Sequence, residues 1–529
     1  MRGTRTHLTQ RWYDEGYYSE KTIRDVVDEN IKRFGDKKLV VWSQCQPSET
    51  TLGECYERGR KLAGALLDMG FKPGDVMAMQ MPSWAEAIVG YHACLQIGLI
   101  VLPIIHVYGV QEVDHILTAS KAKGLITPNN WNGLPYHDRD YAARQEDMKW
   151  IVVGEAPKGA VSFEELEKRG HTNYEPPKLH ADDVHVTNYT SGTTADPKGV
   201  LHTHNSLSAE IHQSLKSTGD NIGEEVFVSP NPFGHIAGMI SNVLLPLFGG
   251  QDVIMMDGWD PGACLELFAK YKATKSGGAP FFLQTLLTSP DLKEACKSLR
   301  LFGCGGAGVA QTLIETAEEN GIFSFRAYGS TEHPSTTSGI WGDPLEYRSQ
   351  TDGHLLDGVH LKLVDEDGKE VKTGEPGEIL SIGPDMCVGY VNEEHNDAFT
   401  DDGWYRTGDV GILNENNCLT ITDRIKDIII RGGENISAKE VEEVLGRHAK
   451  VNEAVAVAIP DDKYGEKVCV FVQSSNKKDP ITFEELTEHF KASGIAKQKT
   501  PERLEFTDDF PRTLAGKVQK YKLRESLKS

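Results

Sequence analysis

The chain has little that would suit it to bind nucleic acid, an anionic membrane or a metal cluster. Its 56 lysine and arginine residues are outnumbered by 78 aspartate and glutamate residues, giving a net charge of −22 over 529 residues. A protein this acidic offers no general positive field, so a polyanionic ligand must meet a local cationic site. The nine scattered cysteines form no Cys-x-x-Cys pair, so the sequence predicts neither a zinc site nor a disulfide framework.

Long apolar runs are also missing, so no membrane span is expected. The most apolar stretch, residues 93–110, is interrupted by Gln96, Gly98 and Pro103, and we interpret it as a buried strand with its approaches. The first residues lack the apolar segment of a signal peptide, and the last three are not the peroxisomal Ser-Lys-Leu signal. Together with the odd number and scattered positions of the cysteines, these features favour a reducing compartment, and we expect the cytoplasm.

Helical and strand-like stretches alternate along most of the chain. Residues 22–34 and 56–69 have helical patterns, and residues 76–79 and 101–105 are short apolar runs. This alternation predicts an α/β fold of layered sheets covered by helices. Near residue 425 the pattern changes to a short strand at 428–430, followed by two helices with capping-box spacings, Ser437 with Glu440 and Thr482 with Glu485. The last hundred residues therefore form a separate α/β unit.

One loop has a composition suited to phosphate. Residues 190–199 read TSGTTADPKG, between a strand suggested by Val184 and Val186 and another at 200–202, with Asn205 expected to cap a helix over 206–215. Small residues expose backbone N–H groups, which form an anion cradle together with the hydroxyls, and Lys198 adds a mobile positive charge. The Walker A pattern is absent, so this is a different kind of phosphate loop.

Six stretches together resemble the adenylate-forming superfamily, which includes acyl-CoA synthetases, aryl-acid ligases, nonribosomal adenylation domains and firefly luciferase. They are YTSGTTADPKGV from residue 189, PFGHIAG from 232, YGSTEHP from 328, GWYRTGD from 403, DRIKDIIIRGGEN from 423 and PRTLAGK from 511. The resemblance implies a large domain of stacked sheets and helices over residues 1–425 and a small mobile domain over 426–529. It also implies two half-reactions, in which a carboxylate and ATP form an acyl-adenylate and pyrophosphate, and a thiol then displaces AMP.

The resemblance assigns roles to residues in these stretches. ATP binding is assigned to Thr190, Ser191, Gly192, Thr193, Thr194, Lys198, Ala307, Tyr328, Gly329, Ser330, Asp409 and Arg424. Within this set, the loop residues grip the β- and γ-phosphates, Tyr328 lies against the adenine and Asp409 accepts the ribose hydroxyls. Thr331 contacts the α-phosphate, and Glu332 holds Mg²⁺, a hard cation that prefers oxygen ligands.

The small domain carries the remaining implied roles. Lys517 bridges the substrate carboxylate and the α-phosphate during adenylation. Lys426 is the hinge about which the small domain turns between the two half-reactions. After that turn, Gly432, Gly433 and Glu434 line the entrance for CoA, where glycines allow close approach of the pantetheine.

The acyl pocket is assigned to His235, Gly305 and Gly306, and two interpretations of His235 stay open: a catalytic role and a hydrogen-bonded structural one. The PFGHIAG stretch has no aspartate to bind a substrate amine, so we expect a simple carboxylic acid rather than an amino acid. Gly234 and the glycines at 305, 306 and 308 are small, which would leave room for a medium-chain, alicyclic or aromatic acid.

The acceptor and the partners leave several alternatives. Only twelve residues follow Lys517, so we expect free CoA or a separate carrier protein as acceptor, and the GGEN string favours CoA. An acid–CoA ligase is the main hypothesis, against a carrier-loading adenylating enzyme, a luciferase-like oxygenase and a non-catalytic relative. The expected partners are a carboxylic acid, ATP, Mg²⁺ and CoA, without nucleic acid or membrane, and a homodimer is left open.

Overall fold

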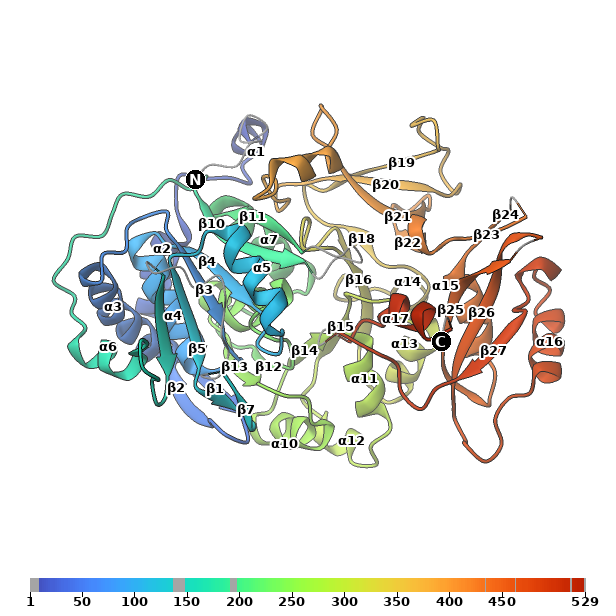
Figure 1. The fold of residues 1–529 in the computed structure, drawn as a ribbon, viewed down its shortest axis with the longest axis horizontal. Coiled ribbons are helices and arrows are strands. Elements are labelled where there is room, and N and C mark those ends of the chain that lie inside the picture. Colours follow the sequence, from blue (N-terminus) through green and yellow to red (C-terminus); the bar gives the residue numbers. More distant parts are fainter. Residues whose placement is uncertain are drawn as a thin grey trace.

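The computed structural model describes residues 9–136, 148–190, 197–432, 434–461, 463–513 and 516–527. The side chains of Lys426, Glu434 and Asn435 lie outside that description. The phosphate-loop residues Ser191, Gly192, Thr193 and Thr194, and the CoA residue Gly433, lie outside it altogether. Figure 1 shows a large body built from most of the chain, with the C-terminal unit, whose sheet begins with β23 (Ile429–Arg431), at one end.

Two sheets form the centre of the large body within the described residues. The first is nine-stranded, in the order β18 (His354–Leu355), β17 (Thr337–Ser338), β16 (Ser324–Tyr328), β15 (Leu301–Cys304), β14 (Lys275–Gly278), β12 (Val226–Ser229), β13 (Asp252–Met256), β1 (Lys38–Trp42) and β2 (Ser48–Thr51). The second is seven-stranded, in the order β11 (Lys198–Thr203), β10 (Val184–Thr190), β4 (Ile100–Ile104), β3 (Val76–Gln80), β5 (Gly124–Pro128), β8 (Lys149–Val153) and β9 (Val161–Ser162). From β1 to β16 the first sheet is parallel, so the ends of these strands meet at one edge, where ligands commonly bind.

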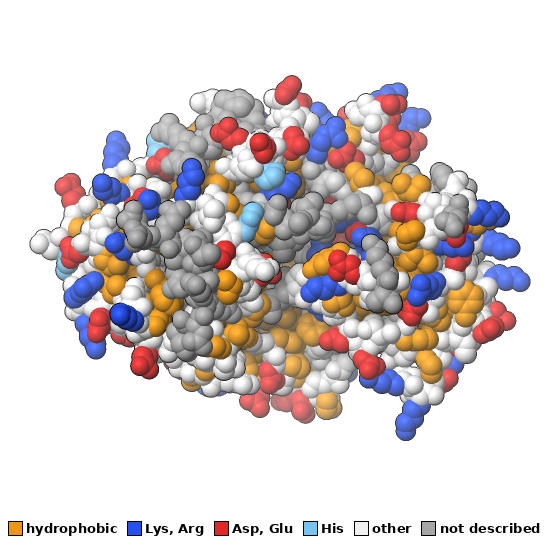
Figure 2. Space-filling view, viewed as in Figure 1, with side chains coloured by type: hydrophobic (Ala, Val, Ile, Leu, Met, Phe, Trp, Pro, Cys, Tyr) orange, Lys and Arg blue, Asp and Glu red, His pale blue; other side chains and the backbone are white. Residues whose placement is uncertain are grey.

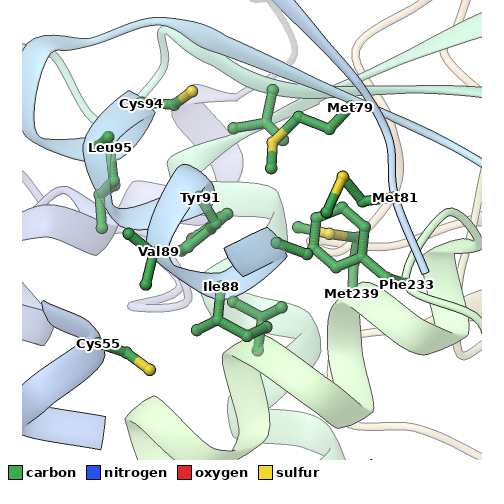
Figure 3. Close-up of a cluster of buried hydrophobic side chains, with 14 of the residues drawn as sticks. Cys55, Met79, Met81, Ile88, Val89, Tyr91, Cys94, Leu95, Phe233 and Met239 are labelled. Atoms are coloured by element: carbon green, nitrogen blue, oxygen red, sulfur yellow. The ribbon is translucent and has the colours of Figure 1, made fainter. Parts of the chain in front are cut away.

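A buried helix, α4 (Ala85–Ile97), lies within the main hydrophobic core. Twelve of its residues are buried on all faces, as expected for a helix that is apolar all round. Figure 3 shows Ile88, Val89 and Tyr91 of this helix among Met79 of β3, Phe233 and Met239. The helix packs against α3 (Leu52–Asp68), where a Cβ on Gly59 would lie 2.4 Å from the Cβ of His92.

Two smaller sheets, and a two-stranded pair of β6 (Asn130–Trp131) with β7 (Leu134–Pro135), complete the sheets of the described structure. One is four-stranded, in the order β19 (His360–Val364), β20 (Gly377–Ile382), β21 (Tyr405–Leu413) and β22 (Leu419–Arg424). A 3-10 turn, Ile425–Asp427, leads from β22 into the C-terminal unit. Its sheet has the order β24 (Glu434–Ile436), β23 (Ile429–Arg431), β26 (Gly465–Ser474) and β25 (Val451–Asp461), and β27 (Arg503–Phe506) pairs with β26. Helices α15 (Ala438–Gly446), α16 (Phe483–Ala492) and α17 (Lys520–Ser526) accompany it.

These observations confirm the mixed α/β class, and they correct local details of two helix starts. Helix α7 (His204–Ser217) is capped by Thr203, whose hydroxyl accepts from the N–H of Ser206, and not by Asn205. The Asn205 amide instead donates to Asp182 and Tyr13. The box at Thr482 and Glu485 is complete. At the other expected box, Ser437 accepts from the N–H of Glu440, but the Glu440 carboxylate pairs with Lys499.

The surface mixes both signs of charge. In the face drawn in Figure 2, acidic and basic side chains are interspersed, and basic ones are frequent at the end formed by the C-terminal unit. No helix among the described residues is long and apolar enough to cross a bilayer. Despite the acidic net charge, this face therefore shows no single continuous patch of acidic side chains.

Buried histidines should make the fold sensitive to acid. Burial lowers the pKa of His92 and His204 to about 3 and that of His106 to about 4. The unfolded chain, whose histidines titrate near pH 6.5, then binds more protons than the native state below that pH, so stability falls as the pH drops from about 6.5 toward 4.

Substitution of one of these histidines tests this dependence. His92 is fully buried, and both of its ring nitrogens lack a hydrogen-bond partner among the described residues. We expect His92→Leu to lose less stability than the parent between pH 6.5 and 5, as measured by urea unfolding at each pH. Parallel losses in both proteins would contradict the assignment of the acid sensitivity to this residue.

Candidate active site

A tight turn at the end of β16 carries the Tyr328–Pro334 motif. A Cβ on Gly329 would lie 1.9 Å from the carbonyl oxygen of Pro334, so only glycine permits this close approach. The Ser330 N–H donates to the His333 carbonyl at 2.9 Å, and the His333 N–H donates to the Ser330 hydroxyl at 3.2 Å. These bonds fix the conformation of the turn that presents Thr331 and Glu332.

The Glu332 carboxylate is buried and held by a tyrosine that the motifs do not include. The Tyr390 hydroxyl donates to Glu332 Oε1 at 2.7 Å, and Glu332 is 7% exposed. Burial, and then the neighbouring Glu332 carboxylate, raise the pKa of Tyr390, so it keeps its proton and remains a donor. The Lys198 Nζ lies 5.7 Å from the centre of the Tyr390 ring. Tyr390 therefore connects the lysine of the phosphate loop with the expected metal ligand.

The phosphate loop closes a hairpin between β10 and β11. Thr190 pairs with Lys198 in the antiparallel register, so the two residues face each other across the base of the loop. Backbone contacts also place Tyr390 beside this hairpin. The Val391 N–H donates to the Gly199 carbonyl at 2.8 Å, and Val200 forms an antiparallel β-bridge with Tyr390. The expected strand–loop–strand is confirmed in its two strands.

Three expected nucleotide-binding residues meet at Asp409. Tyr328 donates its hydroxyl hydrogen to Asp409 Oδ2 at 2.7 Å, and the Arg424 Nε lies 2.6 Å from Asp409 Oδ1. Asp409 is 3% exposed and pairs with Arg424 in the β21–β22 register. Burial, and then the Asp409 charge, raise the pKa of Tyr328. The carboxylate is thus oriented from both sides, as a precise acceptor for hydroxyl groups would need to be.

His235 begins the short helix α8 (Ile236–Met239). Its Nδ1 accepts from the N–H of Ala237 at 3.2 Å, which places the ring hydrogen of the neutral form on Nε2. Desolvation lowers the pKa of His235 to about 4, so the ring is neutral at pH 7. A π-helical turn, Ile240–Leu244, follows α8, and such turns are frequent at functional sites. The structure thus gives His235 a local capping role.

The glycines near the expected acyl pocket are small for different reasons. A Cβ on Gly234 would lie 2.3 Å from the backbone nitrogen of Ile105, so Gly234 is required by contact between two backbones and does not leave room for substrate. That expectation was wrong. Gly305 lies against the Ala327 carbonyl, with 3.0 Å from an added Cβ, whereas Gly306, at φ +77°, and Gly308 have nothing within 4 Å. Open space is therefore found only at Gly306 and Gly308 of these four.

The loop that carries Lys517 contacts the large body. A Cβ on Gly516 would lie 2.8 Å from the Cβ of Ala279 and 3.5 Å from that of Phe281. The Arg512 guanidinium lies 5.5 Å from the centre of the Phe281 ring. Ala279 directly follows β14 and precedes α11 (Pro280–Leu287). The residue before Lys517 thus lies beside the end of β14, although β14 is far away in the sequence.

The loop is also fixed internally. The Thr513 N–H donates to the Lys517 carbonyl at 2.8 Å, and the Lys517 N–H donates to the Thr513 hydroxyl at 3.2 Å. Gly516 adopts φ +79° and donates to the Thr513 carbonyl at 2.8 Å. This compact turn sets the position of the Lys517 backbone.

The expected CoA-binding and hinge residues belong to the C-terminal unit. Gly432, at φ +61°, donates its N–H to the Tyr464 carbonyl at 2.7 Å, and Glu434 pairs with Arg431 between β23 and β24. Lys426 lies in the 3-10 turn that follows β22. The contacts of Gly432 and Glu434 join these two residues to their own unit, whereas the Lys517 loop reaches the large body.

Substitution of Gly516 should weaken the contact with the large body. Gly516→Ala combines the cost of an L-residue at positive φ, about 1–2 kcal/mol, with a steric overlap at Ala279. We expect faster tryptic cleavage after Arg512 and Lys517 than in the parent protein.

Gly494→Ala is the matched control. Gly494 has φ +76° in the same unit and nothing within 4 Å of an added Cβ. Equal cleavage rates in the two variants would show that the contact of Gly516 with Ala279 contributes nothing to the position of the loop.

Known proteins share both the sequence and the arrangement. A family model described as AMP-binding enzyme matches residues 27–391, and one described as AMP-binding enzyme C-terminal domain matches residues 440–517. The chain is 31% identical over 538 residues to a medium-chain fatty-acid–CoA ligase of Escherichia coli, covering 100% of this chain and 94% of that protein. It is also 31% identical to a long-chain-fatty-acid–CoA ligase of Thermus thermophilus, with 96% of each covered.

A solved relative has been seen in two states. The chain superposes on ATP-bound MatB from Rhodopseudomonas palustris with a TM-score of 0.86 at 27% identity, over 96% of this chain and 99% of that one. For apo MatB the TM-score is 0.77, over 97% and 99%. Because a family model spans more than half of the residues and full-length relatives are acid–CoA ligases, the chain belongs to the AMP-binding enzyme family, within the adenylate-forming superfamily, as an AMP-forming acid–thiol ligase.

Proposed function

We propose that the protein is an ATP-dependent carboxylic acid–CoA ligase that acts on a medium-chain, alicyclic or aromatic acid. The acid becomes an acyl-adenylate, and the acyl group passes to CoA with release of AMP and pyrophosphate. The observation that carries this proposal is the contact of the Lys517 loop with the end of β14, in a body that also holds Thr331, Glu332 and Asp409 at one site.

In adenylation, a carboxylate oxygen bonds to the α-phosphorus while the bond to the β-phosphate oxygen breaks and pyrophosphate leaves. Both reactants are anions, so charge must be neutralised where it develops. Lys198 and the loop from Thr190 to Thr194 would grip the β- and γ-phosphates, Thr331 would contact the α-phosphate, and Lys517 would bridge it to the carboxylate. Asp409, oriented by Tyr328 and Arg424, would accept the ribose hydroxyls beside Ala307, Gly329 and Ser330.

Mg²⁺ would be held by Glu332 together with phosphate oxygens. The Glu332 carboxylate is a hard oxygen ligand, and Tyr390 fixes one of its oxygens. No cluster of three or more metal-ligating side chains occurs in the described parts of the chain, which suits a cation that is bound by one carboxylate and the nucleotide. When bound, the ion would supply positive charge to the phosphates.

Thioester formation would require the small domain, residues 426–529, to turn about Lys426. In the present arrangement Lys517 is at the large body, and the higher TM-score with ATP-bound than with apo MatB supports its identification as the adenylating arrangement. After the turn, Gly432, Gly433 and Glu434 would line the path of CoA, whose thiol attacks the acyl carbon and displaces AMP.

The size of the acid is supported by space and by relatives. Gly306 and Gly308 leave room near β15, His235 would border the acyl group as a neutral side chain, and one full-length relative acts on medium-chain fatty acids. Loading of a separate carrier protein is the alternative acceptor reaction, because adenylation proceeds identically in both.

A panel of acids tests the substrate class. We expect a higher kcat/KM for hexanoate, benzoate or cyclohexanecarboxylate than for acetate in ATP–pyrophosphate exchange, because each additional buried methylene contributes about 0.8 kcal/mol. Release of AMP should then depend on CoA. A preference for acetate would overturn the proposed substrate, and AMP release that needs a carrier protein would favour the alternative.

Two substitutions should separate the half-reactions. Lys517→Ala should lower pyrophosphate exchange by about 100-fold or more, because the developing charge loses its counter-ion, while thioester formation from supplied acyl-adenylate continues. Lys426→Pro should do the reverse, because proline fixes φ near −65° and restricts Ile425. Equal losses of both half-reactions in either folded variant would contradict its assigned role.

A further inference from the structure

Behind the Thr331–Glu332 turn, β11 contributes a buried histidine that contacts the turn directly. His202 is fully buried, and its Nε2 lies 2.7 Å from the carbonyl oxygen of Thr331. A carbonyl only accepts, so Nε2 carries the hydrogen, and Nδ1 accepts from the Ser206 hydroxyl at 3.3 Å. Burial lowers the pKa of His202 to about 4, so this neutral form persists at pH 7.

His333, the residue after Glu332, is held by residues of the four-stranded sheet and of the segment that follows β20. Its Nδ1 lies 2.9 Å from the Ser381 hydroxyl of β20 and its Nε2 lies 3.2 Å from Asp385 Oδ1. Both His333 and Asp385 are fully buried. A Cβ on Gly383 would lie 2.6 Å from His333 Nε2, so the chain passes close to the ring only because residue 383 is glycine.

A second carboxylate shares this interior. Glu210, on α7, is fully buried and accepts from the hydroxyls of Ser214 and Ser335 at 2.9 and 2.7 Å. Its Oε2 and the Oδ2 of Asp385 have no hydrogen-bond partner among the described residues. Burial, and then the Asp385 charge, raise the pKa of Glu210 to about 8, as expected when two acids are buried near each other.

Filling a core with polar groups such as these lowers the stability of the fold. Buried polar and charged side chains lower stability unless they are paired, and apolar replacements of similar volume are often neutral or stabilising. Here the paired groups all hold the Thr331–Glu332 turn, because His202 binds the Thr331 carbonyl and His333 continues the same turn. The Cys387 N–H completes the set by donating to the Glu332 carbonyl at 2.8 Å.

We propose that His202 and the His333–Asp385 pair are positioning residues for adenylation, which fix the Thr331–Glu332 turn for the α-phosphate and the metal ion. The proposal rests on the proposed ligase function. It assigns these residues to adenylation alone. Thioester formation from a preformed acyl-adenylate needs neither the metal nor the triphosphate, so it should not require the positioning residues.

The test compares an apolar with a hydrogen-bonding replacement. His202→Leu removes the donor to the Thr331 carbonyl, whereas the amide of His202→Gln can still donate. By analogy with residues that orient metal ligands, we expect His202→Leu and Asp385→Leu to lower the rate of pyrophosphate exchange about 10- to 100-fold and to raise the Mg²⁺ concentration needed for half-maximal rate. His202→Gln and Asp385→Asn should recover most of the rate.

Thioester formation from supplied acyl-adenylate is the internal reference, and should stay within about twofold of the parent in all four variants. His92→Leu is the matched control, because it removes a fully buried histidine that lies in α4, and should leave the ratio of the two half-reactions unchanged. Equal losses in both half-reactions, or a Gln variant no better than the Leu variant, would overturn the proposal.

Failure of the proposed function would be seen separately. If the parent protein makes no adenylate from any acid in the panel, the ligase function fails at that step. Calorimetric binding of ATP with Mg²⁺, measured without an acid, then still tests the positioning role. His202→Leu should weaken metal-dependent ATP binding and His202→Gln should restore it; unchanged binding in both would overturn the proposal on its own.

Discussion

A short antiparallel backbone contact outside the main sheets holds the active site together. Residues 388–391 run beside β11, with Val388 N–H donating to the Leu201 carbonyl and Leu201 N–H donating to the Gly389 carbonyl, both at 2.9 Å. This contact brings Tyr390 to Glu332, and Tyr390 in turn to Lys198. The proposed phosphate loop and the Thr331–Glu332 turn come from different sheets, so their spacing is fixed by this contact together with the hydrogen bond from His202 of β11 to the Thr331 carbonyl.

The same geometry resolves the electrostatic difficulty of an acidic enzyme with anionic substrates. With a net charge of −22, the protein cannot attract ATP by its overall field, so cations must be local and their positions fixed. Lys198 lies beside a tyrosine ring, Arg424 is paired with Asp409, and Lys517 is carried on a compact turn. Burial of Glu332 and Asp409 keeps their hydrogen bonds strong in a low local dielectric.

Contiguous motifs could be predicted from the sequence, because they resemble the motifs of the adenylate-forming superfamily. Glu332, Asp409 and Arg424 were expected at a nucleotide site, and the latter two are in contact. Tyr390, His202 and Asp385 could not be found this way, since their contacts depend on pairings between distant segments. Gly234 shows a different error. Its small size suggested space for substrate, but the backbone at Ile105 occupies the place that a side chain would take. Composition does not reveal which neighbour a glycine accommodates.

In the proposed mechanism the site combines a rigid part with a part that moves, and the contacts of the two parts differ accordingly. The Thr331–Glu332 turn is fixed by backbone bonds, buried histidines and two sheets. The Lys517 loop, by contrast, meets the large body through Gly516 beside Ala279 and through Arg512 beside the Phe281 ring. A single van der Waals contact and a single guanidinium–ring contact each contribute little, so they could be exchanged for others in the proposed domain turn. The proposed mechanism, with two reactions at one site, needs this asymmetry: phosphate geometry must persist through adenylation, while Lys517, which we propose completes it, must be able to leave.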